Sequence, residues 1–104
     1  MILRLYGQGR VLRRSSREYE HLLATEFENS EPLGARQMIV LNVDLVLTSC
    51  GYGVPLFQFR GDRHMLERWA EAKGRENLEE YRREKNAYSI DGLSTGLFSE
   101  HEED

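Results

Sequence analysis

The sequence predicts an α+β fold in which an antiparallel sheet is flanked by helices. Residues 1–14 and 35–48 place apolar side chains at every second position, as strands do, and residues 54–60 resume this pattern after a glycine-rich connection. Three other segments carry apolar residues at helical spacing. The expected order along the chain is therefore strand, helix, strand, strand, helix, helix.

Two glycines interrupt the apolar face of the first expected strand. Leu3, Leu5 and Val11 share that face with Gly7 and Gly9. Because glycine has no side chain to pack, it weakens a strand interior and usually marks a bulge or the close approach of another backbone. We therefore expect a feature of this kind in the middle of the first strand.

The second expected strand has the most regular pattern in the chain. One of its faces is uniformly apolar and consists of Ile39, Leu41, Val43, Leu45 and Leu47. Its other face mixes apolar residues with polar ones. This contrast predicts a long strand with one face against a core and the other face semi-polar.

Capping signals predict where the helices begin and end. Ser15-x-x-Glu18 has the spacing of a capping box, Asp62 can cap the second helix, and Asn77-x-x-Glu80 resembles another capping box. Turn signals follow each helix, at Glu31-Pro32-Leu33-Gly34, at Lys73-Gly74 and at Asp91-Gly92.

The expected sheet is incomplete. Three strands of this length, each with an apolar face, cannot be covered by one amphipathic helix, and two edges would stay unpaired. We therefore expect the chain to need more sheet, either from another copy of itself or from a missing segment.

Composition narrows the classes of protein. The 104 residues fit a single domain, expected at residues 1–96 and followed by an acidic tail at 97–104, and the net charge of −4 argues against non-specific nucleic-acid binding. No apolar run reaches the ~18 residues of a membrane span, and no signal peptide opens the chain. A single cysteine and three scattered histidines do not supply metal-ligand spacing. The sequence predicts a cytoplasmic, metal-free protein that contacts neither nucleic acid nor membrane.

The glycine-rich segment TSCGYGVPLF, residues 48–57, admits two interpretations. Gly51 and Gly53 suit a bulged bend between two strands, and Pro55 removes a backbone donor where a strand restarts. Alternatively, the glycines let the backbone approach a flat or anionic ligand, with Ser49 and nearby N–H groups as donors. The first interpretation is the commoner one for glycine clusters.

Several side chains near this segment are expected to be structural. Cys50 lacks an adjacent base, so we expect a buried, inert thiol rather than a nucleophile. The aromatic side chains of Phe57, Phe59 and Trp69 are expected in the core. The run at residues 82–85, RREK, is interpreted as a solvated helix face with local charge pairs.

Four segments together resemble a known family. They are LRLYGQGRVL at residues 3–12, TSCGYGVPLF at 48–57, RWAEAKG at 68–74 and YRREKNAYSIDGL at 81–93. In this order and spacing they look like the second half of the pyridoxamine 5'-phosphate oxidase-like family, whose members are flavin-binding proteins of the split β-barrel fold. The resemblance covers roughly residues 1–96.

The resemblance implies a homodimer that holds FMN in a cleft between subunits. By that analogy Ser49, Cys50 and Gly51 would lie near the flavin ring, with Tyr52 as a stacking neighbour and Arg4 at the rim of the cleft. The flavin would carry the redox chemistry, so no residue is expected to act as a catalytic acid or base.

The chain also departs from the family pattern. Family members have an upstream half that contributes basic residues and a Gly-Ser-Gly-Asn-type stretch for the FMN phosphate, and this chain begins where that half would end. It also has Leu93-Ser94-Thr95 where a proline is expected after the leucine. Two functions are therefore open: an FMN-dependent oxidoreductase-like protein, truncated relative to the family, or a non-catalytic dimerising remnant that binds flavin weakly or not at all.

Overall fold

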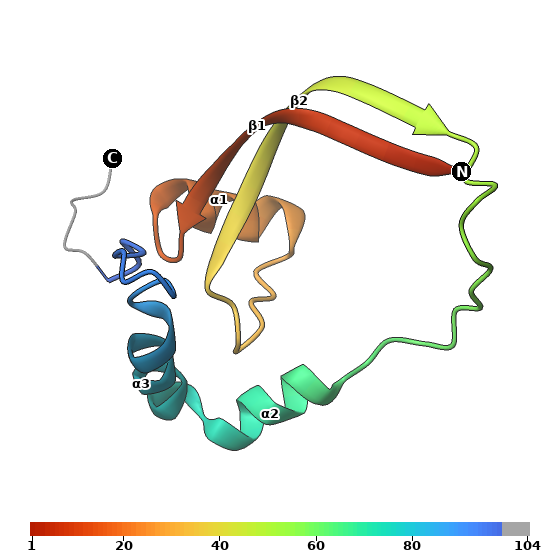
Figure 1. Ribbon diagram of the computed structural model, residues 1–104. Helices are drawn as coiled ribbons and strands as arrows, with labels where there is room; N and C mark the ends of the chain where they lie inside the picture. Colours follow the sequence, from red (N-terminus) through yellow and green to blue (C-terminus); the bar gives the residue numbers. More distant parts are fainter. Residues whose placement is uncertain (99–104) are drawn as a thin grey trace.

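A computed structural model describes residues 1–98 and confirms the α+β class (Figure 1). The chain runs through β1 (Ile2–Arg13), α1 (Arg17–Glu26), β2 (Gln37–Ser49), α2 (Met65–Lys73) and α3 (Arg75–Asn86). In Figure 1 the two strands form a long, curved ribbon, α1 lies beside one end of it, and the helices α2 and α3 follow a long connection. Most of the acidic tail, from residue 99 onward, lies outside the described residues.

The sheet consists of β1 and β2, which pair antiparallel along their whole length and do not close into a barrel. The register shifts once, between Tyr6 and Gly7: Tyr6 pairs with Leu45, Gly7 pairs with Val43, and Asp44 is passed over. A Cβ atom on Gly7 would lie 1.9 Å from the carbonyl oxygen of Asn42. The expected bulge with close backbone approach is therefore confirmed, and it is at Gly7.

The prediction of a third strand at residues 54–60 is wrong. Residues 50–64 contain no strand, and the backbone bond from Val54 N to Gly51 O (3.0 Å) only closes a turn at the start of this segment. A strand requires a neighbouring edge to pair with, and this connection runs away from both strands (Figure 1). Alternation in sequence indicates the propensity for a strand, but it does not supply the partner.

The first helix begins one residue later than its capping box predicts. Ser16 is the N-cap, and its Oγ accepts a hydrogen bond from the backbone N–H of Tyr19 at 3.3 Å. Ser15 instead has a φ of 70°, which turns the chain out of β1. Serine is a favoured N-cap residue at either position, so the geometry of the turn determines which of the two caps the helix.

The caps of the other two helices also differ from expectation. The N-cap of α2 is His64 rather than Asp62, and its side chain makes no capping bond. Gly74, with a φ of 80°, ends α2 as predicted and lets α3 start at once. Asn77 therefore lies inside α3, where its Nδ2 donates to the carbonyl of Lys73 at 2.9 Å.

The buried core is small and lies at one end of the ribbon. Leu12, Tyr19 and Leu23 are buried between β1 and α1, and Leu22, Met38 and Val40 pack partly against them. A second contact joins α2 to α3 through Ala70, Leu78 and an edge-to-face pair of Trp69 and Tyr81, whose ring centroids are 5.2 Å apart. Helix α1 thus covers only the end of one face of the sheet.

The apolar face expected on β2 is divided between the two faces of the ribbon. Residues that pair across antiparallel strands point to the same side, and the bulge at Asp44 changes which residues of β2 share a side. Ile39, Leu41 and Val43 therefore lie on one face, whereas Leu45 and Leu47 lie on the other. The expectation of one continuous apolar face on β2 is wrong for this reason.

One face of the ribbon carries apolar side chains from Leu3 to Val11, and within residues 1–98 no helix packs on it; the end of α3 comes near it only at the Arg13 end, across a pocket. We call it the uncovered face. Its side chains are 41–69% exposed, and they belong to Leu3, Leu5, Val11, Ile39, Leu41, Val43 and Val46. We expected β2 to pack one face against a core. This expectation is wrong for the uncovered face, which packs against no core formed by residues 1–98.

Candidate functional site

The residues expected near a flavin gather at the end of the ribbon farthest from α1. Ser49 pairs with Ile2, and Arg4 pairs with Leu47, so Arg4 and Ser49 lie on the same face near the start of β1. Gly51 has a φ of 70°, and a Cβ atom there would lie 3.4 Å from Cγ1 of Ile2. The turn after β2 therefore folds back onto Met1 and Ile2, so Gly51 lies next to the start of β1, with Arg4 two residues beyond Ile2 on the face that carries Ser49.

The remaining two expected residues point into solvent. Cys50 is exposed, and Tyr52 is 93% exposed. The expectation of a buried thiol is wrong: Cys50 directly follows the last residue of β2 and is exposed there. This end of the ribbon is an open surface. A flat ligand bound there would contact the protein through only one of its two faces.

The aromatic side chains expected in the core are also exposed. Phe57 is 87% exposed and Phe59 82%, because the connection that carries them packs on neither strand. Trp69 is 42% exposed and contacts Tyr81 rather than the sheet. These side chains are hydrophobic, but residues 1–98 do not supply the surface that would bury them.

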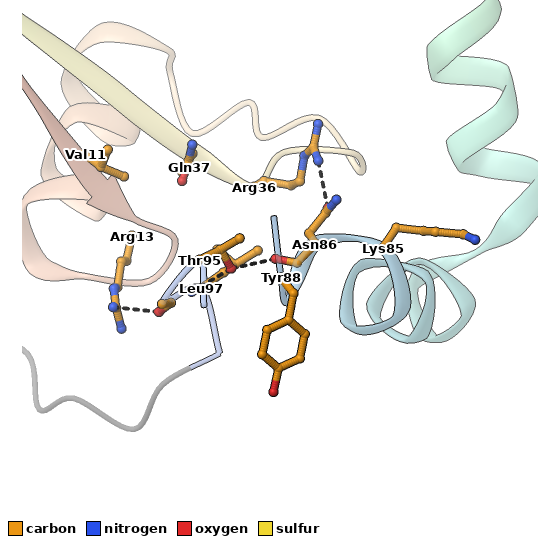
Figure 2. A pocket seen from close by; sticks show the side chains of 10 residues that line it. Val11, Arg13, Arg36, Gln37, Lys85, Asn86, Tyr88, Thr95 and Leu97 are labelled. Atoms are coloured by element: carbon orange, nitrogen blue, oxygen red, sulfur yellow. Dashed lines mark hydrogen bonds between the residues drawn. The ribbon is translucent and has the colours of Figure 1, made fainter. Parts of the chain in front are cut away.

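A pocket of about 790 Å³ lies at the opposite end of the ribbon, between the strands and the segment that follows α3 (Figure 2). Cationic and polar side chains form most of its lining. They are Arg13, Arg36, Gln37, Lys85, Asn86, Tyr88 and Thr95, with Val11, Gly96 and Leu97 completing the wall. Sequence reasoning did not identify this pocket, because its residues come from three parts of the chain that no motif links.

Hydrogen bonds hold the lining in place. Arg36 Nη1 donates to Oδ1 of Asn86 at 2.8 Å, and Arg13 Nη2 donates to the carbonyl of Gly96 at 2.8 Å. Thr95 Oγ1 donates to the carbonyl oxygen of Asn86 at 2.6 Å, as Figure 2 shows. These bonds fasten the segment after α3 to the helix and to β1, so the pocket has defined walls.

A buried arginine lines two neighbouring cavities, which share Arg36 with this pocket. Arg82 is 9% exposed, and its Nη2 donates to the carbonyl of Leu33 at 3.3 Å. Burial lowers the pKa of Arg82, and the nearby charges of Arg14 and Arg36 lower it further. The interpretation of residues 82–85 as a solvated face is thus wrong for Arg82. It follows the buried Leu78 by four residues, and that helical spacing was the signal for its burial.

A second cluster is structural rather than open to a ligand. The hydroxyl of Tyr19, which is 1% exposed, donates to Glu31 Oε2 at 2.7 Å, and Arg14 Nη2 donates to Glu31 Oε1 at 2.7 Å. The hydrogen bond from Arg14 lowers the pKa of Glu31, and burial together with the Glu31 carboxylate raises the pKa of Tyr19 to about 12. This cluster ties α1 and the connection before β2 to the end of β1.

No family model, curated protein or solved structure matches this chain. Among residues 1–98, no three side chains of the metal-ligating types gather into a group that could hold a metal ion. Over the same residues, none of the three helices combines the length and the apolar composition that a membrane crossing requires.

Proposed function

We propose that this chain forms part of an FMN-binding split β-barrel and acts, as a homodimer, as a flavin-dependent oxidoreductase. One observation supports it above all: a long, bulged, two-stranded sheet leaves an apolar face without cover. Such a face requires another layer, and a second copy of the chain would provide it. The assignment of FMN rests on the sequence resemblance.

The exposed surface supports association. A compact monomer of 12.2 kDa exposes about 6,100 Å² by the usual scaling with mass, whereas this chain exposes 9418 Å². The excess, about 3,300 Å², is several times the ~800 Å² that each partner contributes to a standard interface. The radius of gyration, 17.5 Å, also exceeds the ~13 Å expected of a compact domain of this length. The excess, which includes the uncovered face, leaves room for an interface with a second copy.

The far end of the ribbon supplies groups suited to a flavin. Ser49 and the backbone N–H groups of the following turn can donate to the polar edge of the ring, and the side chain of Tyr52 can lie against its face. Arg4, on the same face as Ser49, can neutralise anionic charge at the rim. When bound, the flavin supplies the redox chemistry, and these residues bind and orient it.

Titration of the purified protein with FMN tests this proposal. We expect saturable quenching of FMN fluorescence, and we expect Tyr52→Ala to weaken binding about tenfold, because stacking contributes ~1–3 kcal/mol. Arg4→Gln should weaken binding as well. Arg68→Gln, which removes a cation from the exposed side of α2, is the matched control and should leave the affinity unchanged. A colourless protein that takes up no added FMN would contradict the flavin assignment.

The alternative is a non-catalytic protein that dimerises and binds flavin weakly or not at all. The openness of the far end favours it, since Tyr52 and Cys50 are exposed and Arg4 is the one cation among the expected residues. A phosphate dianion held by one cation loses charge-assisted bonds worth ~1.5–3 kcal/mol each. A dimer that shows no FMN quenching would support this alternative over the oxidoreductase.

A further inference from the structure

We propose that the cavity between α2, α3 and the residues before β2 binds a small aromatic carboxylate, with Arg36 and Arg82 as the cations that hold the carboxylate group. We call it the α2–α3 cavity, and its volume is about 370 Å³. Arg36 precedes β2, whereas Ser49 ends that strand, so the cavity lies at the opposite end of the ribbon from the residues proposed for FMN. The proposal therefore does not rest on the flavin assignment.

The two arginines of this cavity are not neutralised by a carboxylate. Both line it, whereas no aspartate or glutamate of residues 1–98 does. Arg36 donates to Oδ1 of Asn86 at 2.8 Å, and Arg82 donates to the carbonyl of Leu33 at 3.3 Å. Neither arginine forms an ion pair within the described part of the chain. The cavity therefore combines two cations with no protein anion.

The charges around Arg82 are mainly of its own sign. Burial lowers its pKa most, and the charges of Arg14 and Arg36 lower it further, whereas Glu79 raises it. Arg14 is paired with Glu31 at 2.7 Å, which leaves Arg36 as the cation without a carboxylate beside Arg82. Desolvating a cation is unfavourable unless a counter-charge compensates it. A bound anion that contacts both arginines would supply that counter-charge.

Arg82 also keeps donors that no protein group uses. It is 9% exposed, and its one hydrogen bond within residues 1–98 comes from Nη2, so Nε and Nη1 have no partner there. Among the described residues, no buried side-chain nitrogen or oxygen is cut off from solvent without a hydrogen-bond partner. Nε and Nη1 must therefore be accessible to water, and hence to the oxygen atoms of a ligand.

Of the two cavities that Arg82 lines, the α2–α3 cavity suits an anion better. The other has a volume of about 160 Å³ and already contains the carboxylate of Glu79. In the α2–α3 cavity, Asn86 adds a donor, because its Oδ1 accepts from Arg36 and its Nδ2 stays available. Guanidinium groups present planar pairs of N–H donors that match the two oxygens of a carboxylate.

The rest of the wall suits a flat, apolar body. Trp69 and Tyr81 line the cavity as an edge-to-face pair with ring centroids 5.2 Å apart, and Leu66 and Leu78 add aliphatic surface. Nζ of Lys73, which does not line the cavity, lies 5.2 Å from the centroid of Trp69 and 4.8 Å from that of Tyr81. The volume is near the lower end of the usual range for small-molecule sites, about 300–1,000 Å³, which indicates a small ligand.

The fluorescence of Trp69 tests this inference directly, because Trp69 is the only tryptophan of the chain and lines the cavity. The purified protein is titrated with phenylacetate, and phenylacetamide is the uncharged control of the same shape. We expect a saturable change with phenylacetate at a dissociation constant of about 1 mM or below, and a dissociation constant about tenfold higher or more for phenylacetamide. Acetate, which lacks the ring, should also bind at least about tenfold more weakly.

Variants of the two arginines make the result specific. Arg36→Gln removes an exposed cation and should raise the dissociation constant about tenfold or more, whereas Arg36→Lys keeps the charge and should raise it less. Arg82→Met keeps an apolar stem in the core but removes the buried charge, and should weaken binding as Arg36→Gln does. Arg60→Gln changes the net charge equally in the exposed connection and should leave the dissociation constant within about twofold.

Three results would overturn the inference. They are no saturable change up to about 10 mM phenylacetate, equal affinity for phenylacetate and phenylacetamide, and equal weakening by Arg36→Gln and Arg60→Gln.

Discussion

At the scale of single residues, the most constrained side chain is Tyr19. Its ring is buried with Leu12 and Leu23, and its hydroxyl donates to the Glu31 carboxylate at 2.7 Å. A hydrogen bond to a charged group in such a site stabilises the folded state more than one between neutral groups does. The small core therefore depends on one polar contact as well as on apolar packing.

Tyr19→Phe should lower the free energy of unfolding by ~1.5–3 kcal/mol, because it removes the hydroxyl and leaves the ring in place. Urea denaturation followed by circular dichroism measures this loss. Tyr52→Phe is the matched control, since the side chain of Tyr52 is 93% exposed. Equal stability of the two variants would show that the bond between Tyr19 and Glu31 contributes nothing to the fold.

The Glu31 carboxylate should also make stability depend on pH. Hydrogen bonds from Arg14 and then from Tyr19 hold its pKa below its ordinary value of 4.5. A lowered pKa in the folded state contributes stability that is fully present above the unfolded value and is lost as pH falls through the folded value. The contribution is therefore present above about pH 4.5 and disappears on further acidification.

Comparison with Glu31→Gln checks this pH dependence. The difference in free energy of unfolding between the wild-type chain and the variant should be largest near pH 7 and should shrink below about pH 4.5. A difference that stays constant from pH 7 to pH 3 would contradict the assignment of the ionised carboxylate as the stabilising form.

At the scale of elements, the bulge in the ribbon is the feature that organises the sheet. Gly7 lies where the register shifts, and its missing side chain lets the backbone of Asn42 approach. By passing over Asp44, the bulge places Ile39, Leu41 and Val43 on the uncovered face and Leu45 on the opposite one. One glycine thus determines which apolar residues face which side.

Gly7→Ala should destabilise the ribbon strongly, by ~2 kcal/mol or more, because the new Cβ atom would meet backbone atoms that cannot rotate away. Gly9→Ala is the matched control two residues along the same strand, where a Cβ atom meets nothing within 4 Å. Thermal unfolding of both variants measures the contrast. A melting temperature for Gly7→Ala equal to that of Gly9→Ala would contradict the bulge.

The elements also show what the sequence alone could provide. Two strands, three helices, the helix end at Gly74 and the feature at Gly7 were predictable, because local propensity and steric demands determine them. The third strand and the burial of Phe57 and Phe59 were predicted wrongly, since both require a partner surface that residues 1–98 do not contain.

The two candidate sites differ in how far the sequence reveals them. The grouping of Arg4, Ser49 and Gly51 follows from the pairing of β1 with β2, whose antiparallel register brings the start of one strand to the end of the other. The cationic pocket depends instead on where α3 packs relative to the strands. Nothing in the spacing of Arg13, Arg36 and Lys85 indicates that they face one cavity.

At the scale of the whole molecule, exposed apolar surface is the dominant property. The uncovered face, the aromatic side chains of the connection at 50–64 and the thin core all leave hydrophobic area in contact with water. Exposed patches of this extent usually mark an interface. We therefore expect the chain to associate through the uncovered face before any ligand is bound.

Ile39→Lys tests which face associates. Ile39 is 69% exposed on the uncovered face, so a lysine there should leave the fold of one chain intact while placing charge in the interface. Gln8→Lys, on the opposite face of the same ribbon, is the matched control. We expect Ile39→Lys alone to lower the associated fraction in sedimentation velocity. If both variants associate equally, the interface does not include the uncovered face around Ile39.

The most direct test of the central claim is the mass of the purified chain in solution, measured by light scattering after size exclusion over a series of concentrations. The account predicts a particle of twice the 12.2 kDa of one chain, independent of FMN. A single species of 12.2 kDa that unfolds cooperatively on its own would contradict it, because such a chain would be stable with its apolar sheet face in water.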